Sequence, residues 1–239
     1  MTQMSFRARL LNTLRAAQPV IALPGVMVVG SELPNLLEPD AAATLVVSED
    51  VDIAVAVEAH ATVKSALQHI VGLHASPDEP SVWLPDSADL IEVNFVGRDR
   101  SLSDPEDNYV LEDDELPLLV FGALTLLGEG RPARVEGIEL VLPRTSGLLL
   151  EKLLTERSGE KGDRDLLVVL GLLLAATSED LAELEQLYAG LRAELRHSVR
   201  ANLAVLSLLG PRPGMPDPRP HRARIVGLLR QLERHEAAR

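Results

Sequence analysis

The hydrophobic pattern of the chain changes at about Pro143, and this change constrains the fold more than any other feature. Before it, short apolar runs rich in valine and isoleucine are separated by turn residues, which is typical of strands. After it, leucines recur at helical spacing. We therefore predict a domain of the α/β or α+β class over residues 1–143 and a helical region over 144–210. A proline-rich linker and a short basic helix or tail should follow over 211–239.

The composition narrows the classes of function. Hydrophobic residues make up 46% of the 239 residues but aromatic residues only 3%, so the core must consist mainly of aliphatic side chains. The net charge of −13 repels phosphate backbones and argues against long nucleic acid as a partner. The absence of cysteine excludes disulfides and zinc–thiolate sites, and fits a cytoplasmic protein.

Neither a secretory signal nor a membrane span is expected. Residues 1–15 lack an uninterrupted apolar stretch. The longest apolar runs, 116–127 and 166–176, are shorter than the ~20 residues that cross a bilayer.

In the N-terminal half, residues 26–29 read as a buried strand that ends at Gly30 and Ser31. Further strands are predicted over 44–47, 51–57 and 135–142, and a pair over 81–84 and 90–96. Helices are predicted over 6–17 and 63–71. The acidic segment 101–115 should be a solvated loop, and 116–127 is compatible with helix or strand.

The C-terminal half is predicted to contain helices over 148–153, 166–175, 178–195 and 199–209, with a polar break over 158–163. Ser178 is a candidate cap of the third of these helices. The leucine stripe over 181–195 is most simply core or a dimer seam. The helical half therefore offers a surface for a homo-oligomer or a partner protein.

Gly30 and Ser31 are the first candidates for a functional role. Glycine lets a phosphate approach the backbone closely, and serine can donate its hydroxyl and its N–H to a phosphate oxygen. Taken alone, Gly-Ser is also a common turn pair.

Asp50 and Asp52 are the second candidates. Residues i and i+2 of a strand point to the same face, so both carboxylates project together while Val51, Ile53 and Val55 face the core. A divalent cation relieves the repulsion between two such carboxylates, and Mg²⁺ prefers carboxylates together with substrate phosphates. The alternative is two solvated acids near the end of a strand.

Glu92 is the third candidate. It shares one strand face with Asn94, while Ile91, Val93 and Phe95 occupy the other. If this strand lies beside the strand of Asp50 and Asp52, Glu92 completes a cluster of three carboxylates. It could then act as a general base or as a third metal ligand. The alternative is an exposed hairpin residue.

Together these segments resemble the nucleotidyltransferase superfamily, which has a polymerase-beta-like palm. The likeness covers residues 20–175. It rests on Val26-Met27-Val28-Val29-Gly30-Ser31, on Ser48-x-Asp50-x-Asp52 and on Ile91-Glu92-Val93. The form Ser48-x-Asp50-x-Asp52 is similar to the Thr-x-Asp-x-Asp of a bacterial branch that includes abortive-infection toxins. Leu142-Pro143 with Lys152, and Arg157 with Arg164-Asp165, look like later segments of that branch.

The resemblance implies a mixed sheet with flanking helices, followed by a helical region. It implies that Gly30 and Ser31 hold the triphosphate and that Asp50 and Asp52 bind Mg²⁺. Glu92 would be the third catalytic and metal-binding carboxylate. Lys152, Arg164 and Asp165 would contact the nucleotide or have a structural role.

The activity implied is Mg²⁺-dependent transfer of a nucleoside monophosphate from an NTP, such as ATP, to a hydroxyl. That hydroxyl could belong to a protein, an RNA end or a small molecule. The alternative is a catalytically inactive domain of the same fold that acts as a binding or oligomerisation module. An acidic, arginine- and lysine-free segment after Gly30 favours this alternative.

Overall fold

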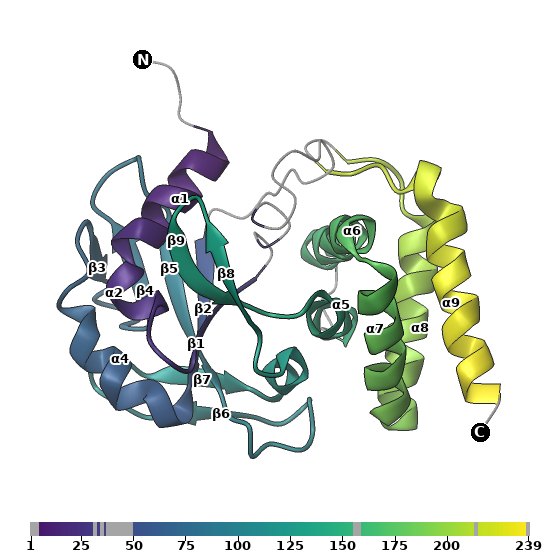
Figure 1. Cartoon of the computed structure of the whole chain (residues 1–239), viewed down its shortest axis with the longest axis horizontal. Coiled ribbons are helices and arrows are strands. Elements are labelled where there is room, and N and C mark those ends of the chain that lie inside the picture. The colour runs from purple at the N-terminus through teal and green to yellow at the C-terminus, as the bar shows by residue number, and fades with distance from the viewer. Residues whose placement is uncertain are drawn as a thin grey trace. The chain divides into compact units, whose positions relative to one another are not determined.

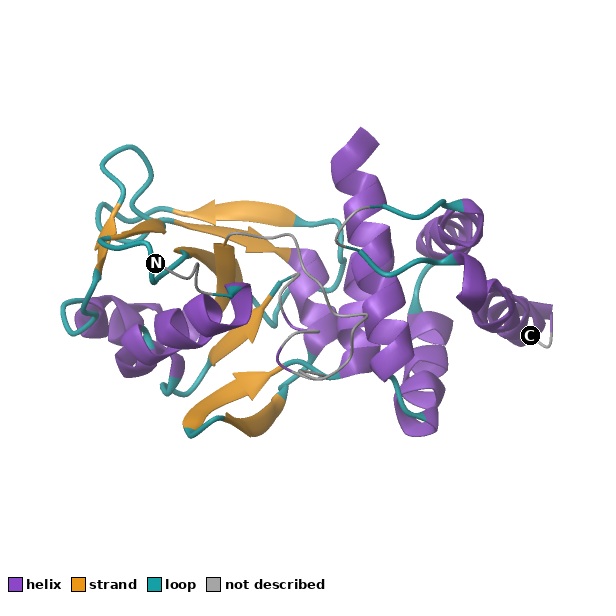
Figure 2. Ribbon diagram, turned by 90° about the horizontal axis from the view of Figure 1, so that it is seen from above, coloured by secondary structure: helices purple, strands orange, loops and turns teal. Residues whose placement is uncertain are grey.

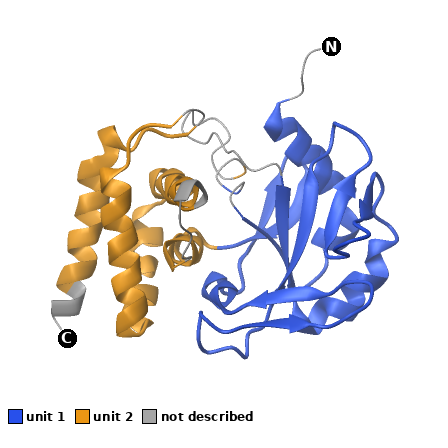
Figure 3. Cartoon of the chain, turned by 180° about the vertical axis from the view of Figure 1, so that it is seen from behind, with its two compact units in different colours: residues 1–33, 48–143 blue, residues 34–47, 144–239 orange. Residues whose placement is uncertain are grey.

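The computed structural model describes residues 5–30, 33, 36, 50–154, 159–212 and 215–237. The chain divides into two compact units, residues 1–33 with 48–143 and residues 34–47 with 144–239 (Figure 3). Unit 1 has a sheet of parallel and antiparallel strands with flanking helices, and unit 2 is helical. The predicted fold class, a mixed sheet followed by a helical region, is therefore confirmed. The strand expected over 44–47 lies outside the described residues.

Within the described residues, seven strands of unit 1 form one sheet, in which β1, β2, β5, β4 and β3 are successive neighbours (Figure 1). β7 pairs with β5, and β6 pairs with β7. β2 is parallel to β5 and β5 to β7, whereas the remaining pairs are antiparallel. The strands are β1 (Val26–Val29), β2 (Asp50–Ala56), β3 (Leu73–Ala75), β4 (Val82–Pro85), β5 (Glu92–Arg98), β6 (Asn108–Leu111) and β7 (Leu118–Phe121).

Gly97 permits the close contact of β5 with β7. It pairs with Val120, and a Cβ added at Gly97 would lie 2.5 Å from Val120 Cγ2. Any larger residue would push the two strands apart. The glycine thus explains how β7 comes close enough to β5 to join the sheet.

The helices of unit 1 pack on the apolar side chains of the sheet. Leu10 and Leu14 are buried on α1, and Thr13 Oγ1 accepts a hydrogen bond of 2.9 Å from the backbone N–H of Ile91, just before β5. The buried leucines and this hydrogen bond together hold α1 against the sheet. These elements are α1 (Phe6–Ala16), α2 (Gln18–Ile21), the 3-10 turn η1 (Val57–Ala59), α4 (His60–Leu67) and the 3-10 turn η2 (Gly122–Leu127); a separate pair of strands comprises β8 (Arg131–Val135) and β9 (Ile138–Leu142).

Unit 2 contains only helices and loops in its described residues (Figure 2). The predicted polar break over 158–163 is wrong for its described part, because α6 already begins at Gly159. The C-terminal segment forms a helix, α9, that buries Ile225 and Leu232, rather than a tail. The helices are α5 (Thr145–Leu154), α6 (Gly159–Ala175), α7 (Ser178–Gly190), α8 (Ala193–Leu208), the 3-10 turn η3 (Arg219–His221) and α9 (Arg222–Ala237).

Two segments of ambiguous or acidic character form strands. The run 116–127 divides into β7 and then η2, so both readings of it apply to different residues. The acidic segment 101–115 is not simply a solvated loop, since it contains β6.

Among the described residues, no helix combines the length and the apolar character that a membrane crossing requires.

Candidate functional site

Asp50, Asp52 and Glu92 emerge from two neighbouring strands of unit 1. In the parallel pairing of β2 with β5, Asp50 lies opposite Glu92 and Asp52 lies opposite Asn94. All four side chains are half-buried, while the intervening Val51 and Val93 and the following Ile53 and Phe95 are buried. Because strand side chains alternate, the four polar groups share one face of the sheet. The neighbouring position of the two strands, which the sequence left conditional, is thus observed.

Asn94 connects the two aspartates. Its Nδ2 donates a hydrogen bond of 3.0 Å to Asp50 Oδ2 and a longer one of 3.4 Å to Asp52 Oδ1. The amide thereby screens two carboxylates that would otherwise repel each other. The sequence places Asn94 on the same strand face as Glu92, but no role is predicted for it from that position alone. Its i+2 spacing from Glu92, which matches that of Asp50 and Asp52, is the signal that points to it.

Glu92 has an environment that disfavours its charge. Burial is the main cause that raises the pKa of its carboxyl, and the negative charges of Asp50 and Glu79 raise it further. A carboxylate with a raised pKa is a stronger base than a solvated one. Glu92 is therefore suited chemically to accept a proton from a hydroxyl bound on this face.

Gly30 lies at the same end of the sheet as the acids. β1 runs antiparallel to β2 with Val29 opposite Asp52, so the end of β1 meets the beginnings of β2 and β5. Gly30 follows directly, is buried and has a φ of 114°, a conformation that other residues rarely adopt. Ser31, the other predicted phosphate-binding residue, lies outside the described residues.

The donor set on this face fits a divalent cation only with help from a substrate. Within the part of the chain that is described, no three acidic or histidine side chains are grouped closely enough to hold a metal ion. Asp50 and Asp52 nevertheless supply carboxylate oxygens from one face, joined by a shared amide. Mg²⁺ commonly binds through one or two carboxylates, water and substrate phosphates, so two aspartates are compatible with such an ion.

The remaining predicted residues belong to unit 2. Lys152 is buried on α5, where its Nζ lies 3.2 Å from Glu151 Oε2. On α6, Arg164 is exposed and Asp165 is buried. Their contact with a nucleotide stays a prediction, and Arg157 lies outside the described residues.

Comparisons with known proteins give distant likenesses in three dimensions. No family model and no curated protein sequence matches the chain. The antibiotic-resistance factor ANT(2'')-Ia is 12% identical, with a TM-score of 0.41 over 84% of this chain and 95% of that one. JHP933 from Helicobacter pylori is 14% identical, with a TM-score of 0.40 over 99% and 96%. An antigenic nucleotidyltransferase-like protein from Paracoccidioides brasiliensis is 15% identical, with a TM-score of 0.36 over 82% and 92%. Likenesses this distant assign no activity to the chain.

Proposed function

We propose that this chain is a Mg²⁺-dependent nucleotidyltransferase, which moves a nucleoside monophosphate from an NTP to a hydroxyl acceptor. The observation that carries the proposal is the strand pairing that sets Asp50 opposite Glu92 and Asp52 opposite Asn94 on one half-buried face. Two carboxylates for a cation and a third with a raised pKa are the groups that such a transfer needs.

Each residue has a distinct task in the proposed reaction. The ion, when bound, would neutralise charge on the phosphates. Asp50 and Asp52 would hold that ion, and Gly30 with Ser31 would bind the triphosphate through the backbone. Glu92 would take the proton of the acceptor hydroxyl as its oxygen bonds to the α-phosphorus. The bond from that phosphorus to the bridging oxygen then breaks, and pyrophosphate leaves.

The net charge restricts the acceptors that fit this proposal. With a net charge of −13, the chain repels long nucleic acid. The acceptor hydroxyl would then belong to a protein side chain, an RNA end or a small molecule. Membership of the abortive-infection toxin-like branch, and action in the cytoplasm, are parts of the same proposal.

Calorimetry with each of the four NTPs, with and without Mg²⁺, tests the proposal. We expect Mg²⁺-dependent binding of at least one NTP. Asp50→Asn or Asp52→Asn should weaken this binding at least about tenfold, because even the loss of a residue that only hydrogen-bonds to a metal ligand can have an effect of this size. Asp89→Asn is the matched control, because Asp89 is exposed and loses the same charge. Equal binding by the control and by both site variants would overturn the proposal.

The alternative, an inactive domain that serves as a binding or oligomerisation module, is favoured by two observations. The space between Asp50 and Asp52 is already bridged by Asn94, and the described residues provide no group of three metal-binding side chains. A correctly folded protein that gives no binding heat with any NTP, in Mg²⁺ or Mn²⁺, would support the module and exclude the transferase.

A further inference from the structure

A hollow lies in unit 1, beside α4. It is a pocket of about 610 Å³, within the range of about 300–1,000 Å³ that is usual for small-molecule sites. Its apolar wall includes Leu67, Pro80 and Trp83, and its polar rim includes Lys64, Asp114 and Glu115. An apolar wall with a few polar groups on one side is suited to a ligand that has an apolar body and one charged end.

The pocket is independent of the paired aspartates. Trp83 lies opposite Val93 in the pairing of β4 with β5, and its ring meets the ring of Phe95 edge-on with centroids 6.2 Å apart. Val93 and Phe95 point away from the face that carries Asn94. Trp83 therefore lies on the opposite side of the sheet from Asp50 and Asp52.

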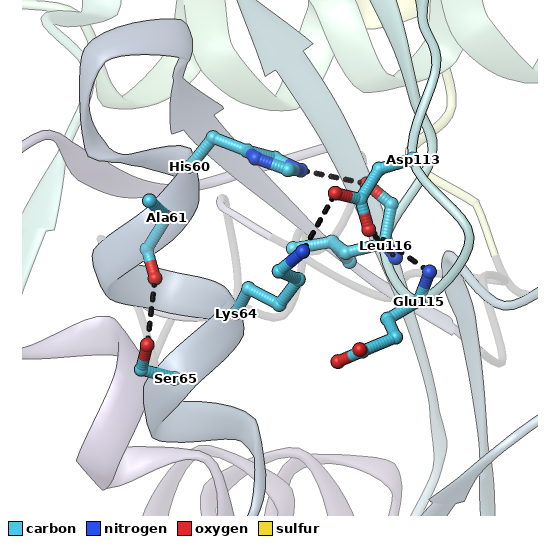
Figure 4. A network of polar contacts seen from close by, with 7 residues as sticks. All are labelled: His60, Ala61, Lys64, Ser65, Asp113, Glu115 and Leu116. Atoms are coloured by element: carbon cyan, nitrogen blue, oxygen red, sulfur yellow. Dashed lines mark hydrogen bonds and ion pairs between the residues drawn. The ribbon is translucent and has the colours of Figure 1, made fainter.

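A network of polar contacts holds the rim in place (Figure 4). Lys64 Nζ donates to Asp113 Oδ2 at 2.7 Å, and Asp113 Oδ1 accepts from the backbone N–H groups of Glu115 and Leu116 at 2.9 and 3.0 Å. His60 Nε2 lies 2.8 Å from Leu116 O. The end of the acidic segment is thereby tied to α4 at two points, which fixes the position of the rim.

The same network sets the charge of the rim. The ammonium of Lys64 is paired with Asp113, and this hydrogen bond is the main reason why the pKa of the Asp113 carboxyl falls far below its ordinary value. Lys64 is therefore already neutralised by a carboxylate. Asp114 and Glu115, both exposed, remain as two further negative charges on the rim.

Trp83 lines the pocket, although most of its side chain is buried. It is 8% exposed, and its indole Nε1 is buried without a hydrogen-bond partner in the described structure, so packing rather than hydrogen bonding positions the ring. An aromatic ring and nearby carboxylates both attract organic cations, the ring through its quadrupole and the carboxylates through their charge.

We propose that the pocket between α4, the β3–β4 hairpin and the end of the acidic segment binds a small organic cation with an apolar body, such as an aryl-alkyl ammonium. The apolar body packs against Trp83 and Leu67, and the ammonium lies towards Asp114 and Glu115. This site differs from the proposed nucleotide site and would exist even in a catalytically inactive domain.

Fluorescence offers a direct test, because Trp83 is the single tryptophan of the chain. We would titrate the full-length protein with phenethylammonium, with the neutral 2-phenylethanol and with the anionic 3-phenylpropionate, and confirm affinities by calorimetry. We expect saturable binding of the cation, weaker binding of the alcohol and the weakest binding of the anion. Raising the NaCl concentration should weaken binding of the cation alone.

Variants separate this rim from the general acidity of the chain. Asp114→Asn with Glu115→Gln should weaken binding of the cation about threefold to tenfold, the range that two solvent-exposed charge pairs supply. Asp107→Asn with Glu112→Gln removes the same charge from the same segment outside the pocket and should change little. Equal effects of the two pairs, or equal affinities for the cation and the alcohol, would overturn the proposal.

The nucleotide-site variants distinguish the two proposals. Asp50→Asn should leave binding of phenethylammonium unchanged, since Asp50 lies on the other side of the sheet. If the wild-type protein binds NTP but not the cation, the pocket proposal fails alone. If it binds the cation but no NTP, the transferase proposal fails alone.

Discussion

Asn94 determines how many negative charges the candidate site carries. It stands opposite Asp52 and donates its amide to both aspartates. A carboxylate at this position would make all four side chains of the two strand pairs acidic. The amide reduces repulsion in the absence of a cation. In the proposed site, where only two aspartates would hold a cation, the affinity for that cation would depend on the phosphates of the substrate.

Asn94→Asp should therefore tighten Mn²⁺ binding by about tenfold, or about 1.4 kcal/mol. The same change should lower the Tm in EDTA, because a third carboxylate then repels the other two without an amide between them. Mn²⁺ titration followed by electron paramagnetic resonance, together with thermal unfolding, would measure both effects. Asn94→Ala serves as the control that removes the amide without adding charge. If Asn94→Asp binds Mn²⁺ no better than the wild type, the two aspartates do not form a cation site.

At the scale of elements, the start of α7 is defined by a reciprocal pair of hydrogen bonds. Asp180 N–H donates to Thr177 Oγ1 at 3.1 Å, and Thr177 N–H donates to Asp180 Oδ2 at 2.9 Å. Thr177 is therefore the N-cap, and the prediction that Ser178 caps this helix was wrong by one residue. Both residues have a hydroxyl, so the sequence alone could not choose between them.

Thr177→Ala should lower the free energy of unfolding by about 1 kcal/mol, which is usual for the loss of an N-cap. Ser178→Ala, one residue inside the helix, should have little effect. Urea unfolding followed by far-UV circular dichroism would compare the two variants, since the single tryptophan lies in the other unit. The assignment of the cap is refuted if Ser178→Ala is the more damaging change.

The strands that the sequence predicted well are those with a strong alternation or a continuous apolar run. β2 and β5 begin within two residues of their expected positions because aspartate, glutamate and asparagine alternate there with buried aliphatic or aromatic side chains. β3, β6 and β8 were missed because each has at most five residues and few of their side chains are buried, so the sequence shows no alternation of buried and exposed positions there. Such strands form because a neighbouring strand is present, which a local pattern does not record.

The candidate site was only partly visible in the sequence for a similar reason. The spacing of Asp50, Asp52 and Glu92 indicated which side chains share a face, because that depends on local geometry alone. The bridging role of Asn94 and the pairing of Lys64 with Asp113 depend on contacts between residues far apart in the chain. The many acidic residues of the segment 101–115 predicted that Asp113 lies in a solvated loop, whereas its ion pair with Lys64 holds it against α4.

On the scale of the whole molecule, the net charge of −13 should make stability depend on salt. Increasing NaCl from 10 to 150 mM shortens the screening length from about 30 to about 8 Å and should raise the Tm by a few degrees at pH 7.5. Differential scanning calorimetry would measure this shift, with the combined Asp107→Asn and Glu112→Gln variant as a less acidic comparison that should respond less. A Tm that falls with salt would mean that ion pairs, such as that of Arg100 with Glu129, outweigh the general repulsion.

The parallel pairing of β2 with β5 has a consequence for the order of events during synthesis. Parallel neighbours require a long crossover, and here α4, β3 and β4 all lie between the two strands in the chain. A nascent chain that has emerged only as far as β4 holds Asp50 and Asp52 without Glu92 or Asn94 beside them. A reaction that needs all four side chains can therefore begin only after β5 has left the ribosome and paired with β2.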